Sequence, residues 1–452
     1  MIIEVFRCIN TAISTKRREA KSNPCEHWLD YAKEKCGSKM VNDTKILLKI
    51  LVLYLPLPLF WALFDQQGSR WTFQATRMDG DIGIYDLKPD QMQVVNPLLI
   101  LTFIPLFEAV FYPLLAKVGI SRPLQKLTCG GILAGIAFII SGLVEFQLEK
   151  TYPILPGAGE AQLRFFNGLP CDYSASSLEA ENFTLKAFQV FEQKHITVEG
   201  EKNVHYKLEL IAGLSNQCPK TMDGVIVLNE TEAWSVFVEF DLKNVFIDDP
   251  DKSETGDPKV RFLLSTKYPS EIKLESGQLV RRTNSIDHEL IDIHSGLYKI
   301  FINDSSIADI NLKQGGVYTV IGHESDGKFQ IHKVEIAAPN SMNMLWLVPQ
   351  YVIMTLGEVM FSVTGLAFSY AQAPDTMKSV LQACWLLSVA LGNAILMIVV
   401  EIKFFQSQAH EFLLFAVLMF VDMIIFIILA RRYKNSGDPN AVPDYDNKKL
   451  IE

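Results

Sequence analysis

The sequence has little that would mark an enzyme or a nucleic-acid-binding protein. Its 452 residues carry 42 Lys and Arg against 51 Asp and Glu, a formal net charge of −9. A nucleic-acid-binding surface needs a basic face, so we expect no nucleic acid partner. No nucleophile–base pair and no metal-ligand spacing is recognisable, so we expect no enzymatic activity, no metal site and no cofactor. The first 43 residues also lack an apolar core followed by a small-residue cleavage site, so we expect no signal peptide.

Cysteine is scarce as well, with seven residues in the chain. Only Cys171 and Cys218 fall in the long polar stretch described below. Two cysteines outside the cell can form a disulfide, and two buried free thiols in separate strands are the alternative.

What the sequence does contain is long apolar runs. The mean hydropathy of +0.17 is high for a chain with 21% charged residues, which fits apolar spans that flank a large soluble segment. A helix needs about 20 apolar residues to cross the membrane. Six runs reach that length, and they start near Ile46, Val94, Leu127, Met344, Val380 and Phe412. The third run, with its stretch GGILAGIAFIISG, has small residues that allow close helix packing.

Residues 149–342, between the third and fourth runs, have a different pattern. They are polar, with short runs in which apolar and polar residues alternate, and this period of two predicts half-buried strands. Many short strands separated by turn signals are typical of β-sandwiches, and the length allows two small ones. The clearest runs are DGVIVLNE, AWSVFVEFDL, KVRFLLSTK, GLYKIFIND and GGVYTVIGH.

The distribution of charge indicates which side of the membrane each loop faces, because positive residues mark the cytoplasm. Basic residues gather before the first run, after the second and after the last, whereas the loop after the first run is acidic. We therefore expect both termini in the cytoplasm and residues 149–342 outside the cell. The basic residues include Lys16, Arg17, Arg18, Lys117, Arg122, Lys126, Arg431 and Arg432, and the acidic ones are Asp79, Asp81, Asp86 and Asp90.

Three glycosylation sequons in the polar stretch agree with this orientation. They begin at Asn182, Asn229 and Asn303. Such motifs also arise by chance, as the sequon at Asn42 on the predicted cytoplasmic side illustrates.

These observations divide the chain into five parts. Residues 1–44 form a cytoplasmic linker, in which CINTAIS and HWLDYAKEKC predict amphipathic basic helices that lie on the membrane surface or bridge bundles. Residues 45–148 and 343–431 each hold three transmembrane helices. The β-sandwich stretch at 149–342 separates them, and residues 432–452 form a cytoplasmic tail.

Charged residues within the runs are candidates for function, because a charge inside a membrane is costly. Glu358 lies in the middle of the fourth run, and we expect it to face a cavity or a partner; a satisfied helix-packing acid is the alternative. Lys49 and Glu108 lie at similar depth with opposite charge, which predicts an ion pair with a structural or gating role. Asp422 lies in the middle of the last run, without an evident partner.

Aromatic and amide side chains accompany these charges. Trp61 and Trp385 lie away from the ends of their runs, which argues against an interfacial belt, although most such residues only pack. Gln67 and Asn96 are amides near the outer ends of adjacent runs. They either join helices to each other or bind the amide groups of a ligand.

Several long motifs resemble the animal proton-coupled oligopeptide transporters of the major facilitator superfamily. They are LPLPLFWALFDQQGSRW, PDQMQVVNPLL and GEVMFSVTGLAFSYAQAPDTMKSVLQACWLLSVALGN. The similarity runs from near the N-terminus to about Arg432 and matches the C-terminal half of that family. It implies an α-helical membrane protein with a six-helix bundle. It also implies an inserted all-β extracellular domain, made of two immunoglobulin-like sandwiches.

The resemblance also implies roles for the polar and aromatic residues. Glu358 would hold the ammonium group of a peptide, and Trp61 and Trp385 would form walls of side-chain pockets. Gln67 and Asn96 would contact the peptide backbone.

Asp65 matches an acid in the same motif, with a less defined role. An Arg–Asp pair of the family appears here as Lys49 and Glu108, so the charges are kept but the bidentate fork of arginine is lost. The family usually has Glu where this chain has Ala367.

The family has twelve spans in two bundles with the substrate site between them, and this sequence matches the linker and the second bundle. We expect a missing N-terminal bundle to be a partner, besides protons, membrane lipid and di- and tripeptides. Proton-coupled symport of these peptides across the plasma membrane is the expected function, with this half inactive alone. The alternative is a membrane-anchored binding protein that uses the β-rich domain after loss of transport.

Overall fold

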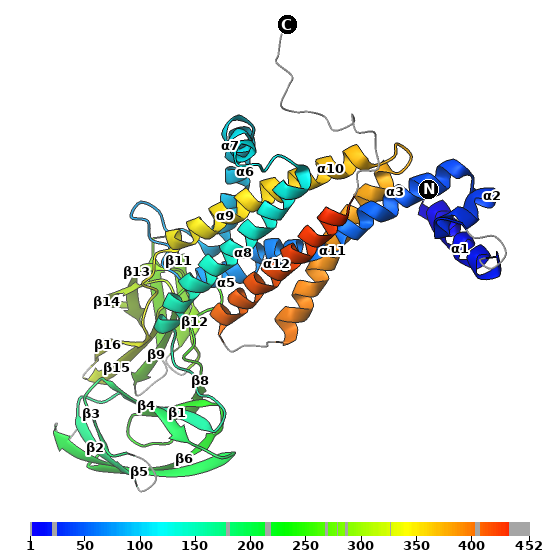
Figure 1. Cartoon of the computed structure of the whole chain (residues 1–452). Helices are drawn as coiled ribbons and strands as arrows, with labels where there is room; N and C mark the ends of the chain where they lie inside the picture. Colours follow the sequence, from blue (N-terminus) through cyan, green and yellow to red (C-terminus); the bar gives the residue numbers. More distant parts are fainter. Residues whose placement is uncertain are drawn as a thin grey trace. The chain divides into compact units, whose positions relative to one another are not determined.

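The computed structural model separates the chain into a helical unit and a β-rich unit (Figure 1). The helical unit comprises Met1–Thr72, Asp90–Phe146 and Trp346–Glu452, and the β-rich unit comprises Phe73–Pro89 and Gln147–Leu345. Most of the predicted tail at 432–452 lies outside the described residues. The described residues are 2–19, 25–177, 181–212, 218–266, 270–277, 279–284, 288–325, 327–402 and 407–433.

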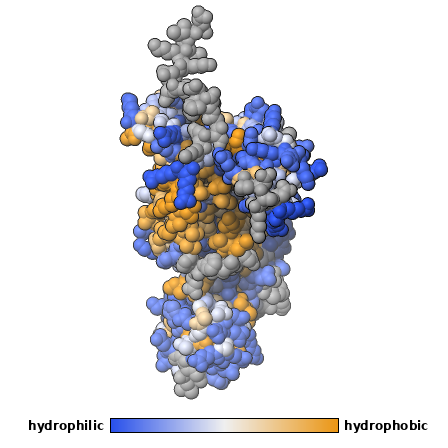
Figure 2. All heavy atoms as spheres, turned by 45° about the vertical axis from the view of Figure 1, so that its right-hand side comes forward, coloured by the Kyte–Doolittle hydropathy of each residue, from blue (hydrophilic) through white to orange (hydrophobic). Residues whose placement is uncertain are grey.

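Five of the six predicted apolar runs lie in helices long enough to cross a membrane, and the first run lies in a bent pair of helices. Five helices among the described residues pass that test, and a bent pair makes a sixth if it is one span. The five are Pro89–Lys117, Pro123–Thr151, Met344–Gln372, Lys378–Val399 and Gln408–Arg432, and the pair is Ser38–Tyr54 with Leu57–Thr76. Apolar side chains gather over this unit on the face shown in Figure 2, as contact with lipid requires.

The first span is broken near its middle. Helix α3 (Ser38–Tyr54) gives way at Pro56 to α4 (Leu57–Phe64), and the direction of Leu57–Thr76 differs from that of α3 by 45°. Proline ends the helical hydrogen bonding because it has no backbone N–H. A 3₁₀ turn (Asp65–Gly68) and α5 (Arg70–Thr76) follow, so the polar end of the motif LPLPLFWALFDQQGSRW lies where the helix changes its winding.

Two further spans are interrupted by a π-helical turn. In the second, α6 (Val95–Leu106) and α7 (Tyr112–Lys117) flank the turn Phe107–Phe111; in the fourth, α9 (Val348–Glu358) and α10 (Thr364–Gln372) flank Val359–Val363. Such turns occur frequently at functional sites. Glu108 lies in the first π turn, and Glu358 directly precedes the second.

The remaining spans are the continuous helices α8 (Pro123–Leu148), α11 (Lys378–Ile402) and α12 (Gln408–Arg432). The small residues of α8 do allow close packing. A Cβ atom on Gly130 would lie 2.6 Å from the Gly357 carbonyl oxygen of α9, and one on Gly135 would lie 3.0 Å from the Phe420 ring of α12. Any larger residue at Gly130 would therefore separate α8 from α9.

The N-terminal stretch folds into short helices, as the two amphipathic motifs predicted. Helix α1 (Ile2–Glu19) is followed by a 3₁₀ turn (Trp28–Ala32) and by α2 (Lys33–Cys36). One face of α1 is buried through Cys8 and Ala12, which pack against the 3₁₀ turn and the start of α3. This packing belongs to the helical unit.

The β-rich unit contains two pairs of sheets, and each sheet has four strands. The strand order is the same in both pairs. In the first pair, β4-β1-β7-β8 packs on β3-β2-β5-β6; in the second, β12-β9-β15-β16 packs on β11-β10-β13-β14. The parallel pairs β1–β7 and β9–β15 also correspond, so the second half repeats the topology of the first. Each of the five runs quoted above as alternating contains most or all of one strand, namely β6, β7, β9, β13 or β15.

The described strands of the first pair are β1 (Glu160–Asn167), β2 (Asp172–Ser177), β3 (Phe183–Leu185), β4 (Val190–Thr197), β5 (Glu201–Ala212), β6 (Thr221–Asn229), β7 (Ala233–Val238) and β8 (Val245–Asp248). Those of the second are β9 (Lys259–Ser265), β10 (Glu271–Ser276), β11 (Leu279–Asn284), β12 (Ile291–Asp292), β13 (Gly296–Ile302), β14 (Ser305–Leu312), β15 (Val317–Ser325) and β16 (Lys328–Ala337). Each pair encloses its own apolar core.

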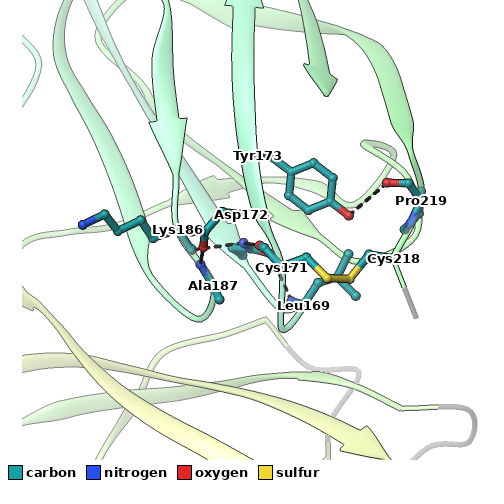
Figure 3. The surroundings of a disulfide bond; sticks show 9 residues. Leu169, Cys171, Asp172, Tyr173, Lys186, Ala187, Cys218 and Pro219 are labelled. Carbon is teal, nitrogen blue, oxygen red and sulfur yellow. Dashed lines mark hydrogen bonds between the residues drawn. A yellow bond between two sulfur atoms is a disulfide. The ribbon is translucent and has the colours of Figure 1, made fainter. Parts of the chain in front are cut away.

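Cys171 and Cys218 form a disulfide in the first sandwich (Figure 3). Their Cα atoms are 6.5 Å apart and both side chains are buried in the core. Next to them, the Tyr173 hydroxyl donates to the Pro219 carbonyl oxygen at 3.2 Å. Burial raises the pKa of Tyr173 to about 12, so this donor stays protonated. The bridge therefore ties the chain before β2 to the chain before β6 within a closed core.

The segment Phe73–Pro89, which runs from the end of α5 to the start of the second span, belongs to the β-rich unit. The Asn340 amide donates to the Thr76 and Met78 carbonyl oxygens at 3.0 and 2.9 Å. The Arg77 guanidinium donates to both carboxylate oxygens of Asp251, at 2.9 and 3.3 Å. The unit thus includes more of the chain than the predicted residues 149–342. Polar contacts attach the segment Phe73–Pro89, which has no alternating pattern that would have indicated it.

Candidate functional site

The predicted binding residues all belong to the helical unit. Trp61 lies in α4, Asp65 and Gln67 in the 3₁₀ turn that follows it, Asn96 in α6, Glu358 in α9 and Trp385 in α11. The site is therefore assembled from four separate segments.

Asn96 and Glu358 are hydrogen-bonded across α6 and α9. The Asn96 Nδ2 atom donates to Glu358 Oε2 at 2.9 Å and to Thr355 Oγ1 at 3.0 Å. Asn96 is buried and Glu358 is half-buried, so a buried amide holds one oxygen of the carboxylate. An anionic carboxylate held this way can accept a further, positively charged donor.

Close backbone packing supports the position of Glu358. Gly357, its neighbour in α9, faces Gly130 of α8, and a Cβ atom on Gly357 would lie 2.7 Å from the Gly130 carbonyl oxygen. The π turn begins immediately after Glu358. Glu358 thus follows a residue that packs closely on α8 and precedes the π-helical turn.

A second carboxylate lies near the first. Asp65 is close enough to Glu358 for the two charges to interact, and the Asn393 side chain of α11 lies beside the Asp65 carboxylate. Two neighbouring carboxylates form an acidic region that favours a cation.

Trp61 and Trp385 contact each other edge to face. Their ring centroids are 6.0 Å apart with an interplanar angle of 84°, and Tyr54 makes a similar contact with Trp385 at 5.6 Å. A Cβ atom on Gly392 would lie 2.8 Å from the Trp61 Cβ, so this glycine lets α11 approach α4. The two tryptophans therefore do pack against neighbouring side chains. Their role as walls of a binding pocket stays a prediction.

Several buried polar atoms of this region have no hydrogen-bond partner within the described part of the chain. They are both amide atoms of Gln67, the Trp61 indole nitrogen and one carboxylate oxygen of Asp65. A buried polar group without a partner costs roughly 1–3 kcal/mol. Unmet donors and acceptors beside an acidic region are the features expected of a site for a polar ligand.

Two other predictions have different outcomes. Lys49 and Glu108 are both exposed, and the ion pairs found among the described residues do not include one between them. Their pairing therefore stays a prediction. One carboxylate oxygen of Asp422 is buried without a hydrogen-bond partner in the described residues, and its role is unassigned.

The sequence analysis did not identify four polar residues of this region, namely Thr355, Asn393, Arg70 and Glu411. Thr355 lies one helical turn before Glu358, and this spacing is the only signal that would have found it. Asn393 of α11 lies beside Asp65, far from it in sequence. The Arg70–Glu411 salt bridge, at 2.9 Å, joins α5 to α12. No local pattern reveals such pairs.

The spans and the polar, partly unsatisfied site define a multi-pass membrane protein. The family model described as "POT family" matches residues 1–202 and 324–411. The chain belongs to this family of transporters.

Curated relatives agree. The chain is 43% identical to "Peptide transporter family 1" of Drosophila melanogaster, over 100% of this chain and 62% of that protein. It is 37% identical to "Solute carrier family 15 member 1" of Rattus norvegicus, over 99% of this chain and 64% of that protein. The chain thus spans less than two thirds of these relatives' length. Among solved structures, the POT family transporter PepTSo matches at 16% identity with a TM-score of 0.46, over 96% of this chain and 55% of that one.

Proposed function

We propose that this chain supplies the second helical bundle of a proton-coupled symporter for di- and tripeptides. The observation that carries the proposal is the Glu358 carboxylate, placed inside a span, held by Asn96 and accompanied by Asp65. A zwitterionic peptide presents an ammonium group that such a site can neutralise. The relatives named as peptide transporters support the same substrate class.

Each residue has a role in this proposal. Glu358 accepts hydrogen bonds from the peptide ammonium, and Asn96 orients the carboxylate for it. The unmet amide of Gln67 pairs with the peptide backbone. Trp61 and Trp385 form an aromatic wall against which apolar peptide side chains pack.

Transport by alternating access requires two bundles that rock about a site between them. The described residues hold up to six spans, the number in one such bundle. We therefore expect no peptide uptake from these residues expressed alone, and uptake when they are joined to the N-terminal bundle of a POT relative.

The proposal includes an orientation and a location. Both termini lie in the cytoplasm of a plasma-membrane protein, and the two sandwiches are extracellular immunoglobulin-like domains. The positive-inside pattern, the Cys171–Cys218 bridge and the sequons at Asn182, Asn229 and Asn303 support this. Protease treatment of intact cells should cleave the β-rich unit and spare both tails.

The decisive test of the site is Glu358→Gln in the joined transporter, which keeps the shape and removes the charge. Charge-assisted hydrogen bonds contribute roughly 1.5–3 kcal/mol, so peptide affinity should fall about tenfold to a hundredfold. An N-acetylated peptide is the matched control, because it lacks the ammonium group. It should bind the wild type and the variant equally, and a large difference between them would show that Glu358 acts elsewhere.

The second candidate is a membrane-anchored binding protein that has lost transport. The independent β-rich unit with two closed cores favours it. A joined transporter that folds and reaches the surface but takes up no peptide would support this candidate.

A further inference from the structure

A cationic hollow lies on the N-terminal helices, away from the binding residues described above. It is lined by one stripe of α1 together with α2. The stripe consists of Arg7, Thr11, Ser14 and Arg18, and Lys35 of α2 completes the lining on the other side. Spacings of four, three and four residues place the four α1 side chains on one face of the helix.

The helix that carries this stripe is fixed from behind. Cys8 and Ala12 of α1 are 0% exposed, and they pack against Leu29, Ala32 and Val41. The stripe is therefore a permanent feature of the surface, since α1 cannot rotate without opening that core.

The cations of the hollow have no acidic partner among the described residues. Arg7, Arg18 and Lys35 take part in none of the ion pairs found among the described residues, and no acidic residue is among the described residues that line the hollow. Neighbouring cations repel each other unless an anion lies between them. Guanidinium groups bind phosphate through two parallel hydrogen bonds, and the hydroxyls of Thr11 and Ser14 add further donors.

Apolar side chains border the same hollow. Ile3 is 82% and Phe6 is 62% exposed, and both contribute to its lining. A free inorganic anion gives no reason for exposed apolar side chains beside the cations. A lipid does, because a basic helix with exposed Phe and Ile lies at the membrane interface and contacts both headgroups and acyl chains.

We infer that this hollow binds the phosphate-bearing headgroup of an anionic membrane lipid. Arg7, Arg18 and Lys35 neutralise the phosphate groups, and Phe6 and Ile3 contact the glycerol and acyl region. The inference is independent of peptide transport, because α1 contains none of the peptide-binding residues.

The test uses the full chain in phosphatidylcholine nanodiscs, titrated with dioctanoyl phosphatidylinositol bisphosphate. Arg7→Gln, Arg18→Gln and Lys35→Gln should each weaken binding about fivefold, since a cation near an anionic lipid surface contributes about 1 kcal/mol. Lys16→Gln and Arg17→Gln are the matched controls, because they remove a cation from the same helix outside the hollow. Circular dichroism checks that the helices remain folded.

Two further arms separate the sources of phosphate. Phe6→Ser should weaken binding of the lipid but leave binding of free inositol trisphosphate unchanged. If inositol trisphosphate or inorganic phosphate binds as tightly as the lipid, the hollow is a soluble-anion site and the lipid assignment is wrong. Equal losses in the Arg17→Gln and Arg7→Gln variants would also overturn it, since they would show a diffuse charge effect.

Discussion

Arg261 of β9 donates two hydrogen bonds to the Asp248 carboxylate of β8, both at 2.8 Å, and so joins the second sandwich to the first. Both side chains are 1% exposed. The Phe166 and Phe246 rings lie 4.9 and 5.1 Å from the guanidinium carbon. Burial alone would raise the pKa of Asp248, but Arg261, together with Ser235 and Arg164, holds that pKa below its usual value.

Breaking this pair should loosen the junction between the sandwiches. Arg261→Met leaves the Asp248 charge buried without its main partner, which costs roughly 3–5 kcal/mol. Hydrogen exchange of the full chain should show lost protection in peptides that cover β8 and β9. Lys243→Met is the matched control, because its contact with Asp241 is exposed and 3.8 Å long, and it should change protection little. Equal protection in the Arg261 variant and the wild type would contradict the junction.

Lys252 predicts a pH dependence in the β-rich unit. It is 2% exposed and its ammonium group donates to Asn340 Oδ1 at 2.9 Å. Burial, aided by the nearby Arg77, lowers the pKa of Lys252 to about 8. Below pH about 8 the folded chain therefore carries a buried ammonium group, which is less favourable than the same group exposed in the unfolded chain.

The sign follows from proton binding in the two states. Between pH about 8 and the usual lysine value of about 10.4, the unfolded chain binds the proton and the folded chain does not. Folding stability attributable to Lys252 should consequently rise with pH in this window and be constant below it. Urea unfolding of the wild type and of Lys252→Met should show a difference that changes only above pH about 8. A constant difference across the whole range would mean that Lys252 titrates normally.

Local patterns predicted the elements of this protein but not their distant contacts. Apolar length located the spans, and alternation located the strands, since both depend on neighbours in sequence. The Asn96–Glu358 hydrogen bond joins residues 262 positions apart, and spacing carries no information about it. The loop around Arg77 likewise joins the β-rich unit through Asp251, 174 positions away. Glu358 itself could be selected as a candidate from the sequence, because a charge within an apolar run is energetically costly.

Gly392 should be intolerant of any side chain. A Cβ atom there would lie 2.5 Å from the Pro58 carbonyl oxygen and 2.9 Å from the Ala62 amide nitrogen. Gly392→Ala should therefore move α11 away from α4, separate Trp61 from Trp385 and lower the thermal midpoint of the helical unit. Ala394→Val is the control, because Ala394 is exposed on the same helix and its variant should behave as the wild type. A Gly392→Ala chain with unchanged indole fluorescence and midpoint would show that α11 can shift at no cost.

Lys49 and Glu108 offer a test of pairing that needs no assumption about transport. Each lies in a proposed span, where an unpaired charge is unfavourable. If they pair when the chain is in a membrane, Lys49→Glu and Glu108→Lys should each reduce surface expression, because each places two like charges together. The double exchange restores opposite charges and should recover expression. Surface labelling of the four chains measures this directly. A double variant that expresses no better than either single variant would show that the two residues act independently, whatever the effect of each one alone.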